Sequence, residues 1–514
     1  MASMSTQIAL ADADCHLALK ARDARFDGSF FTGVTSTGIY CRPVCSVKTP
    51  KRENCRFFHH AAQAENAGFR PCLRCRPELA PHSVVWSIQD ASYILAHQAA
   101  RLLDEPDAWV DAAPSVEKLA ARLGVSDRHV RRIFEAQFGV SPMQYLQTRR
   151  LHTAKQLLAD TSLPITQIAL MSGYASVRRF NAAFVEHYKL NPTQLRRKGV
   201  SAGDGGNLME SGAGITVRLG YRPPYDVQAM LSFFGKRLIT SIELMDNGAK
   251  EPSLARTFRV EAGDKVYSGW LKVKFDEARS QAVLTVSDQL RDVLPQVIRR
   301  VRATFDLDAD PNAINSVLHD DFPAGDGLRV PGAFDGYELA VRAVLGQQIT
   351  VAAARTLAQR MVDTFGEPIS SPWPQLNRLF PSPSALAAAS SDALGQLGIV
   401  RQRQAAITAI AQAVAGKSLH LHGGADVNAT IATLRQLPGI GHWTAQYIAM
   451  RALRWPDAFP SGDVALHKAL GVQGQKNPAR LAEEASWAWK PWRSYAVIRI
   501  WSGAWRGPSA TQKT

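Results

Sequence analysis

Cysteine is missing from most of this sequence, since all six cysteines lie between Cys15 and Cys75. The chain beyond residue 75 therefore has no thiol chemistry and no cysteine ligands for an iron–sulfur cluster. No apolar run approaches the ~20 residues needed to cross a bilayer. The N-terminus, MASMSTQIALADADC, carries early acids and lacks the basic start of a secretory signal. We expect a cytoplasmic protein with no membrane partner.

Acidic residues are scarce relative to basic ones. The 514 residues include 45 Asp and Glu against 60 Lys and Arg, which gives a net charge of +15. A protein this basic most simply binds nucleic acid, and an anionic membrane surface is the alternative. The length suggests about three or four domains of ~150 residues each.

Two close cysteine pairs stand in the N-terminal part, Cys41 with Cys45 and Cys72 with Cys75. Pairs separated by a small folded segment can wrap a tetrahedral metal, and four thiolates favour Zn²⁺. A disulfide framework is the alternative, which the expected compartment disfavours. Because four cysteines leave no open position on the metal, a zinc-dependent hydrolase is also disfavoured. The other two cysteines fit no pair and are expected to be buried or free thiols.

Basic residues crowd around these cysteines. Four thiolates on one Zn²⁺ carry a net charge of about −2 and stay nucleophilic. The basic side chains would bring DNA phosphates close to this nucleophile. They are Arg42, Lys48, Lys51, Arg52, Arg56, Arg70, Arg74 and Arg76.

The stretches GSFFTGVTSTGIYCRPVC and GFRPCLRCRPE resemble the N-terminal domain of Ada-type alkylation-response regulators. The resemblance implies one zinc on the four cysteines and irreversible methyl transfer from a DNA methylphosphotriester to Cys41. Methylation removes one negative charge, so repulsion from DNA falls and affinity for DNA rises. Ada proteins often continue into a second methyltransferase that uses a cysteine. This chain cannot, because no cysteine follows Cys75.

Residues 115–197 contain two similar units, SVEKLAARLGVSDRHVRRIFEAQFG and PITQIALMSGYASVRRFNAAFVEHY. In each unit an alanine, Ala120 or Ala169, precedes a glycine, Gly124 or Gly173, by four positions. The alanine permits close packing of helices and the glycine makes the turn. The pattern therefore predicts two helix-turn-helix units that bind DNA.

With GVSPMQYLQTRRL and LNPTQLRR, this stretch resembles the AraC-type DNA-binding domain. The resemblance makes residues 127–138 and 176–187 the recognition helices. Two such helices in one chain can enter successive major grooves, so a monomer suffices. For each arginine the alternative is a solvated helix face. The candidate groove and phosphate contacts are Arg128, His129, Arg131, Arg132, Arg178, Arg179 and Asn181.

Residues 437–463, LPGIGHWTAQYIAMRALRWPDAFPSGD, predict a glycine hairpin, a helix over 443–453 and one carboxylate after a short loop, Asp463. Gly439 and Gly441 permit backbone angles or close approaches that a Cβ would block. Backbone amides at a helix N-terminus suit a phosphate. An ordinary packing unit with a surface aspartate is the alternative.

The C-terminal half resembles AlkA-type 3-methyladenine DNA glycosylases of the helix–hairpin–helix superfamily through RPPYDVQAMLSFF, RAVLGQQITVAAA, LPGIGHWTAQYIAMR, DAFPSGD and WKPWRSYAVIRIW. The resemblance implies that the alkylated base is flipped out and that Asp463 stabilises an oxocarbenium-like sugar. Some relatives cut the strand with a lysine where this chain has Trp443, so we expect a monofunctional glycosylase. The implied wedge is Gln348. The implied base pocket, for which core packing is the alternative, is Phe233, Trp443, Tyr447 and Trp501.

The predicted fold class is multidomain α+β. Expected cofactors are one Zn²⁺ at the cysteines, none for the glycosylase, and a monovalent cation at the hairpin. Expected partners are double-stranded DNA, both alkylated and promoter, and RNA polymerase. The alternatives are a regulator whose second half only binds DNA, and a repair enzyme whose first half only targets it. The predicted domains are a small zinc-binding α/β methyl-acceptor domain (1–80), an all-α double helix-turn-helix domain (81–198), a flexible linker (199–213), a small antiparallel-sheet α+β domain (214–308) and a mostly α helix–hairpin–helix glycosylase domain (309–514).

Overall fold

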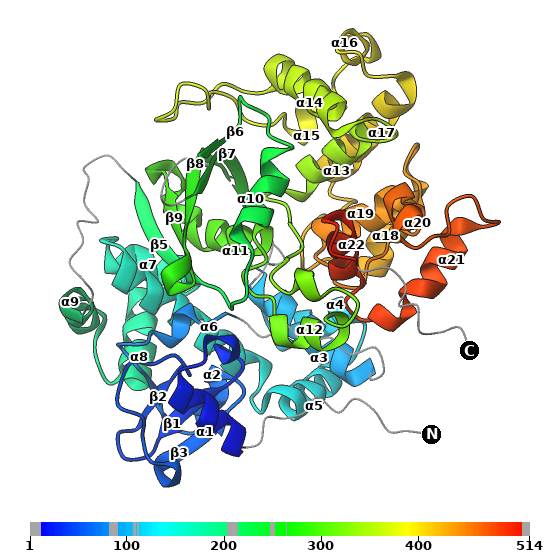
Figure 1. Ribbon diagram of the computed structural model, residues 1–514. Helices are drawn as coiled ribbons and strands as arrows, with labels where there is room; N and C mark the ends of the chain where they lie inside the picture. Colours follow the sequence, from blue (N-terminus) through cyan, green and yellow to red (C-terminus); the bar gives the residue numbers. More distant parts are fainter. Residues whose placement is uncertain are drawn as a thin grey trace, which may run out of the picture. The chain divides into compact units, whose positions relative to one another are not determined.

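The chain folds as two compact units in the computed structural model (Figure 1). The first unit comprises residues 1–104 and 112–223, and the second comprises residues 105–111 and 224–514. Among the described residues, no helix combines the length and apolar character that crossing a membrane requires. The structure describes residues 12–81, 91–105, 109, 113–202, 214–246, 252–263 and 265–505.

A mixed four-stranded sheet with the strand order β3-β1-β2-β4 organises the start of the first unit. Strand β1 pairs antiparallel with β2 and β3, whereas β2 and β4 are parallel, with Tyr40 opposite Pro71. This parallel pairing brings Cys41 and Cys72 to the same end of the sheet. The elements are α1 (Asp12–Ala21), β1 (Phe31–Val34), β2 (Ile39–Cys41), β3 (Cys55–Phe58), α2 (Ala61–Asn66) and β4 (Arg70–Pro71).

Two helix pairs joined by a long helix follow, and they confirm the predicted helix-turn-helix units. Ala120 and Ala169 are buried at the helix contacts, and Gly124 and Gly173 hold left-handed backbone angles, with φ of 68° and 82°. Only glycine adopts such angles without strain, so the turn depends on it. The helices are α3 (Ala91–Asp104), α4 (Val116–Leu123), α5 (Asp127–Phe138), α6 (Pro142–Asp160), α7 (Ile165–Met171), α8 (Val177–Tyr188) and α9 (Pro192–Ala202), and strand β5 (Ile215–Gly220) ends the unit.

Helix α9 corrects the start of the predicted linker, because residues 199–202 are helical. Gly199 and Ser201 are weak helix formers, but extending a helix that already exists is far easier than nucleating one. The rest of the predicted linker, residues 203–213, lies outside the described residues.

An antiparallel sheet begins the second unit, in which β9, β8, β7 and β6 are neighbours in that order. The long β7–β8 pairing runs from Ser253 opposite Lys274 to Ala262 opposite Lys265. The sequence does not predict β6, a four-residue strand with an acid at each end. The strands are β6 (Glu243–Asp246), β7 (Ser253–Ala262), β8 (Lys265–Asp276) and β9 (Gln281–Val286).

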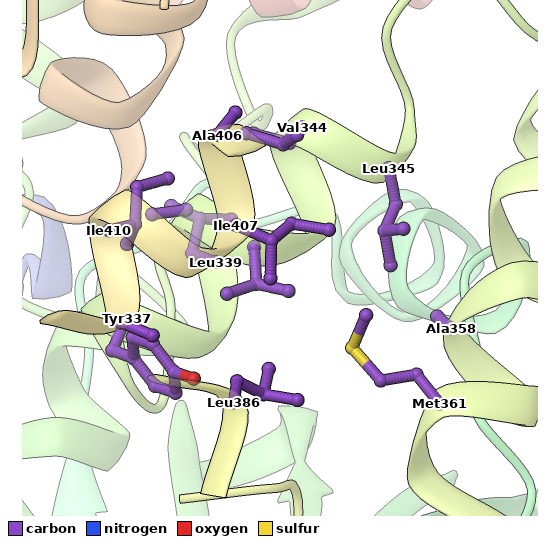
Figure 2. Close-up of a cluster of buried hydrophobic side chains, with 14 of the residues drawn as sticks. Tyr337, Leu339, Val344, Leu345, Ala358, Met361, Leu386, Ala406, Ile407 and Ile410 are labelled. Carbon is purple, nitrogen blue, oxygen red and sulfur yellow. The ribbon is translucent and has the colours of Figure 1, made fainter. Parts of the chain in front are cut away.

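Helices surround the main apolar core of the second unit. Figure 2 shows Val344 and Leu345 of α13, Met361 of α14 and Ile407 of α17 turned toward one another. Helix α19, which follows the glycine hairpin, packs against this core through Ala445 and Ile448. The helices are α10 (Val227–Gly235), α11 (Leu294–Thr304), α12 (Pro311–Leu318), α13 (Gly336–Leu345), α14 (Val351–Phe365), α15 (Pro383–Ala387), α16 (Ser391–Gln396), α17 (Arg401–Ala415), α18 (Val427–Gln436), α19 (His442–Arg451), α20 (Val464–Ala469), α21 (Pro478–Ala485) and α22 (Arg493–Trp501).

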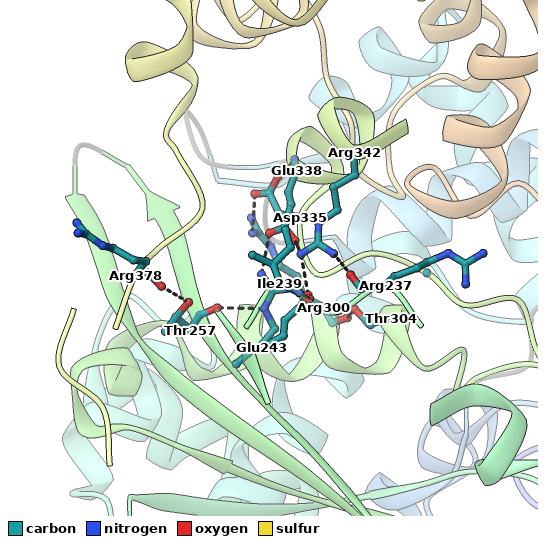
Figure 3. A network of polar contacts seen from close by, with 12 residues as sticks. Arg237, Ile239, Glu243, Thr257, Arg300, Thr304, Asp335, Glu338, Arg342 and Arg378 are labelled. Carbon is teal, nitrogen blue, oxygen red and sulfur yellow. Dashed lines mark hydrogen bonds and ion pairs between the residues drawn. The ribbon is translucent and has the colours of Figure 1, made fainter. Parts of the chain in front are cut away.

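A buried ionic network joins the sheet to α13 (Figure 3). Arg256 donates to Glu243 at 3.2 Å and to Glu338 at 2.7 Å. Arg342 pairs with the same two carboxylates at 2.9 Å and 2.7 Å, and it also donates to the Arg237 carbonyl. Burial opposes ionisation of Glu338, but the two guanidinium groups outweigh it and lower the pKa of Glu338.

Removing one carboxylate should therefore destabilise the second unit. We expect Glu338→Gln to lower its free energy of unfolding by about 3 kcal/mol, because the buried Arg256 and the half-buried Arg342 each lose an anionic partner. The pKa of Glu338 is lower in the folded unit than in the unfolded chain. The stability that its carboxylate contributes is therefore present above the ordinary pKa of glutamate, and it is lost as the pH falls through the folded-state pKa.

Calorimetric unfolding across acid pH would measure both effects. The control is Glu484→Gln, which breaks the exposed pair with Arg480 and should leave the transition unchanged. Equal shifts in the two variants would show that the network does not stabilise the unit.

Candidate functional sites

Four cysteine sulfurs converge at one end of the first sheet. Cys41 ends β2, Cys72 follows β4, and the sulfurs of these two residues, Cys45 and Cys75 all lie within 4.8 Å of one another. A tetrahedral Zn²⁺ with Zn–S distances of about 2.3 Å requires sulfurs about 3.8 Å apart. The donor set and its spacing therefore fit zinc.

Burial differs among the four cysteines. Cys41, Cys45 and Cys72 are 5%, 3% and 7% exposed, whereas Cys75 is only half-buried. The predicted methyl acceptor, Cys41, is therefore not the most exposed of the four.

The remaining two cysteines lie outside the cluster, as predicted. Burial raises the pKa of Cys15 to about 11, with a further contribution from neighbouring aspartates. Burial also raises the pKa of Cys55. Both side chains therefore remain protonated thiols at neutral pH.

Two of the eight basic residues near the cysteines, Arg42 and Arg76, form ion pairs with buried carboxylates of the protein. Arg42 is buried, donates to Asp27 at 2.8 Å and reaches the Cys75 carbonyl at 3.0 Å. Arg76 pairs with Glu78 at 2.9 Å. These two arginines hold the cysteine loops in place. The exposed residues of the set are Lys48, Lys51, Arg52, Arg56 and Arg74.

Helices α5 and α8 each bury one face and expose the other. In α5, Val130, Ile133 and Phe134 point inward. A serine caps the start of each helix, Ser126 for α5 and Ser176 for α8. Of the predicted contacts His129 is half-buried, and those that are exposed are Arg128, Arg131, Arg132, Arg178, Arg179 and Asn181.

The glycine hairpin joins α18 to α19. Gly439 has φ of 72°, and a Cβ there would lie 3.2 Å from the Ala406 Cβ, so this position requires glycine. Gly441 differs from the prediction. Its φ is −83° and no atom within 4 Å would meet its Cβ. Because Gly441 caps α19 without a side chain, the first amides of the helix have no side-chain acceptor from the cap.

Gln347, just after α13, contacts the hairpin, and the sequence does not predict this role. Its side-chain amide donates to the Gly439 carbonyl at 2.9 Å and to the Thr444 hydroxyl at 3.0 Å. It therefore ties the hairpin to the end of α13. The adjacent amides in LGQQIT are the available sequence signal, but the family resemblance implies a role for Gln348 alone. Gln348 is exposed and holds a left-handed backbone with φ of 56°.

Asp463, predicted as a carboxylate that follows a short loop, is also the N-cap of α20. The sequence does not predict this helix. One oxygen accepts from the Leu466 amide at 3.0 Å and from the Trp501 indole at 3.3 Å. The other oxygen accepts from the Trp443 indole at 3.0 Å. Three N–H groups thus hold a half-buried carboxylate in one orientation.

The predicted pocket aromatics lie around this carboxylate. The rings of Trp443 and Tyr447 stack with centroids 5.2 Å apart and an interplanar angle of 9°. The Tyr447 and Trp501 rings are 6.2 Å apart. The structure therefore brings together three of the four predicted pocket residues with Asp463.

Two arginines cover the fourth aromatic, Phe233. The Arg237 and Arg451 guanidinium carbons lie 3.7 Å and 4.8 Å from its ring centroid. Arg451 also donates to the Tyr447 hydroxyl. Burial raises the pKa of Tyr447, but these guanidinium groups outweigh it and lower the pKa overall. Part of the aromatic surface expected to receive a cationic base therefore already contacts cations of the protein.

A surface cavity of about 410 Å³ opens on another side of α19. Its lining includes His442, Gln446, Glu483 and Trp487, but not Asp463. The cavity is therefore separate from the carboxylate and its aromatic neighbours.

Four protein-family profiles match successive parts of the chain. They are the metal binding domain of Ada over residues 14–78, a helix-turn-helix domain over 119–198, the AlkA N-terminal domain over 216–335 and the HhH-GPD superfamily base excision DNA repair protein over 341–492.

Whole-protein comparison finds relatives for the full chain and for each half. A Mycobacterium tuberculosis protein named "probable bifunctional transcriptional activator/DNA repair enzyme AlkA" is 36% identical over 95% of both chains. DNA-3-methyladenine glycosylase 2 of Escherichia coli is 34% identical over 55% of this chain and 95% of its own. Bifunctional transcriptional activator/DNA repair enzyme AdaA of Bacillus subtilis is 33% identical over 34% of this chain and 78% of its own.

Proposed function

We propose, from the premise that this chain belongs to the family of bifunctional transcriptional activator/DNA repair enzymes, that it senses DNA alkylation with one half and excises alkylated bases with the other. The observation that carries the excision activity is the Asp463 carboxylate, held by two indole N–H groups beside the glycine hairpin. The four-cysteine cluster supports the sensing activity.

The proposed domain organisation keeps the predicted boundaries except at the linker, which begins after the last residue of α9. The cytoplasm is the proposed compartment, because chromosomal DNA is the substrate. The proposed domains are a methyl-acceptor domain (1–80), a helix-turn-helix domain (81–202), a linker (203–213), an α+β domain (214–308) and a glycosylase domain (309–514).

In the sensor, the Cys41 sulfur attacks the methyl carbon of a DNA methylphosphotriester. An S–CH₃ bond forms, the CH₃–O bond breaks, and the phosphate leaves as an ordinary phosphodiester anion. Zinc, when bound by the four cysteines, supplies the chemistry that keeps the sulfurs as thiolates at neutral pH. The thioether product has no charge, so the site repels DNA less than before.

The helix-turn-helix pairs would then hold promoter DNA. The exposed arginines of α5 and α8 lie on the side of each helix opposite its buried residues. From there they can reach phosphates and base edges. Because one chain carries two recognition helices, a monomer is the proposed binding form. RNA polymerase is the proposed protein partner, as activation of transcription requires.

In the glycosylase, the hairpin amides of Gly439 and Gly441 would bind a DNA phosphate, with a monovalent cation at the same turn. Gln348 would fill the gap left by the flipped nucleotide, whose base lies against Trp443, Tyr447, Trp501 and Phe233. The C1′–N bond breaks and its electron pair leaves with the base. Asp463 stabilises the oxocarbenium-like sugar, and water then adds to C1′ and releases a proton to solvent. Because Trp443 supplies no amine, the products are the free base and an intact strand with an abasic site.

Incubating the full chain with methylated duplex DNA tests both activities. We expect chromatography to detect free 3-methyladenine, denaturing gels to show no strand break before alkali treatment, and mass spectrometry to find one methyl group on Cys41. Methyl uptake and tighter DNA binding without base release would instead identify a regulator whose second half only binds DNA.

The indole donors allow a finer test of the excision site. We expect Trp501→Phe to slow base release roughly tenfold, because a hydrogen bond to a charged group contributes about 1.5 kcal/mol or more. Trp505→Phe is the matched control, since that indole donates to the Ala469 carbonyl instead of Asp463. Single-turnover rates equal to wild type in both variants would show that the Trp501 donor has no catalytic importance.

A further inference from the structure

A single buried carboxylate in the first unit collects hydrogen bonds from three other elements. Glu65 of α2 has a side chain only 1% exposed. One of its oxygens accepts from the Tyr40 hydroxyl at 2.8 Å and from His152 at 3.0 Å. The other accepts from the Thr148 hydroxyl at 2.8 Å and from His187. Burial opposes ionisation, but the two histidines outweigh it and lower the pKa of Glu65.

The partners of Glu65 connect the two sites of the first unit. Tyr40 directly precedes Cys41 on β2, and His187 lies in the last turn of α8. Thr148 and His152 lie on α6, which runs between the two helix pairs. The carboxylate therefore stands between the strand that carries the methyl acceptor and the second recognition helix.

A methyl group on Cys41 adds volume to a buried, packed part of the first unit. Cys41 packs in a buried cluster with Cys45 and Cys72, against Ile39 and Val47. Because protein interiors are close-packed, an added carbon forces neighbouring atoms to move, and β2 is covalently attached to the sulfur that gains it.

Movement of β2 would be transmitted by Tyr40, the residue that precedes Cys41. Tyr40 is fully buried, and its ring meets Phe31 edge to face at 5.7 Å. Its hydroxyl has a fixed partner in Glu65, whose other oxygen holds His187. A shift of the strand therefore changes the hydrogen bonds that position the end of α8.

We propose that Glu65 is a positioning residue through which methylation of Cys41 changes the placement of the recognition helix α8. The proposal rests on the sensor function proposed above. It adds a structural effect of methylation, transmitted through Glu65, to the electrostatic effect of the lost charge. The change in charge weakens the repulsion of DNA in general. The structural effect changes the position of α8 and requires Glu65.

Hydrogen exchange on the full chain tests this route. The protein is incubated with a duplex carrying one methylphosphotriester, and mass spectrometry verifies the methyl group on Cys41. We expect methylation to change the exchange rates of the α8 amides, residues 177–188, in the wild type. In Glu65→Gln, methyl uptake should persist while the α8 response is lost. The methylation-linked gain in affinity for duplex DNA should also fall by about fivefold or more.

Two further variants separate coupling from simple destabilisation. Tyr40→Phe removes the hydroxyl that connects β2 to Glu65 and should behave like Glu65→Gln, which keeps the proposal testable if one variant fails to fold. Thr148→Val removes a donor to the same carboxylate but leaves the Tyr40–Glu65–His187 connection intact, so it should keep the wild-type response.

Distinct results would overturn the coupling and the sensor function. An α8 response in Glu65→Gln equal to that of the wild type would overturn the coupling, as would an unresponsive α8 in wild-type protein methylated on Cys41. Failure of Cys41 to take up a methyl group would overturn the sensor function itself.

Discussion

Asp463→Asn should reduce the release of 3-methyladenine by at least about a hundredfold, because the amide carries no negative charge to stabilise the oxocarbenium-like sugar. The amide also replaces one acceptor oxygen with a donor. One of the two indole N–H groups, from Trp443 or Trp501, then loses its acceptor. Single-turnover release from a duplex containing 3-methyladenine measures the effect.

The fold should survive this substitution, since asparagine caps a helix about as well as aspartate does. Asp310→Asn is the matched control, because Asp310 caps α12 through the backbone amides of Asn312 and Ala313. It should release base at the wild-type rate. Near-normal release by Asp463→Asn would remove this residue from the catalytic role.

Cys41→Ala should abolish methyl uptake from alkylated DNA, because the sulfur that forms the new bond is absent. The substitution also leaves three sulfurs for a metal that prefers four, so zinc content should fall. Base release should continue at the wild-type rate, because the described side chains and amide that contact Asp463 all belong to the second unit. Mass spectrometry, metal analysis and the excision assay measure the three quantities.

Cys55→Ala is the matched control for this experiment, since Cys55 is equally buried but lies outside the cluster. It should accept one methyl group and retain zinc. Because Cys75 is more exposed than Cys41, it is the alternative candidate for the methyl acceptor. A methyl group found on Cys75 of the wild-type chain would move the acceptor to that residue.

Local rules account for what the sequence predicts well. The helix-turn-helix units depend on an alanine and a glycine four residues apart, and the glycine angle is a property of one residue. The zinc ligands likewise depend on spacing within two short pairs. Such features need no knowledge of distant parts of the chain.

Long-range contacts explain what the sequence does not predict. Arg42 belongs to a basic stretch, and only folding brings Asp27 beside it and removes it from the DNA-facing surface. Phe233 and Arg451 lie far apart in the chain but meet in the structure. The cap role of Asp463 was missed for a different reason, because six-residue α20 is too short for its apolar periodicity to stand out.

The confinement of every cysteine to the first unit has a consequence under oxidative stress. Oxidants such as peroxide convert thiolates stepwise into sulfenic and sulfinic acids, which neither bind zinc nor accept a methyl group. The Asp463 site has no cysteine that could suffer this damage, because no cysteine follows Cys75. In a cell exposed to oxidants and alkylating agents together, the cysteine sensor of alkylation would therefore be inactivated. The glycosylase activity that removes the damaged bases would remain.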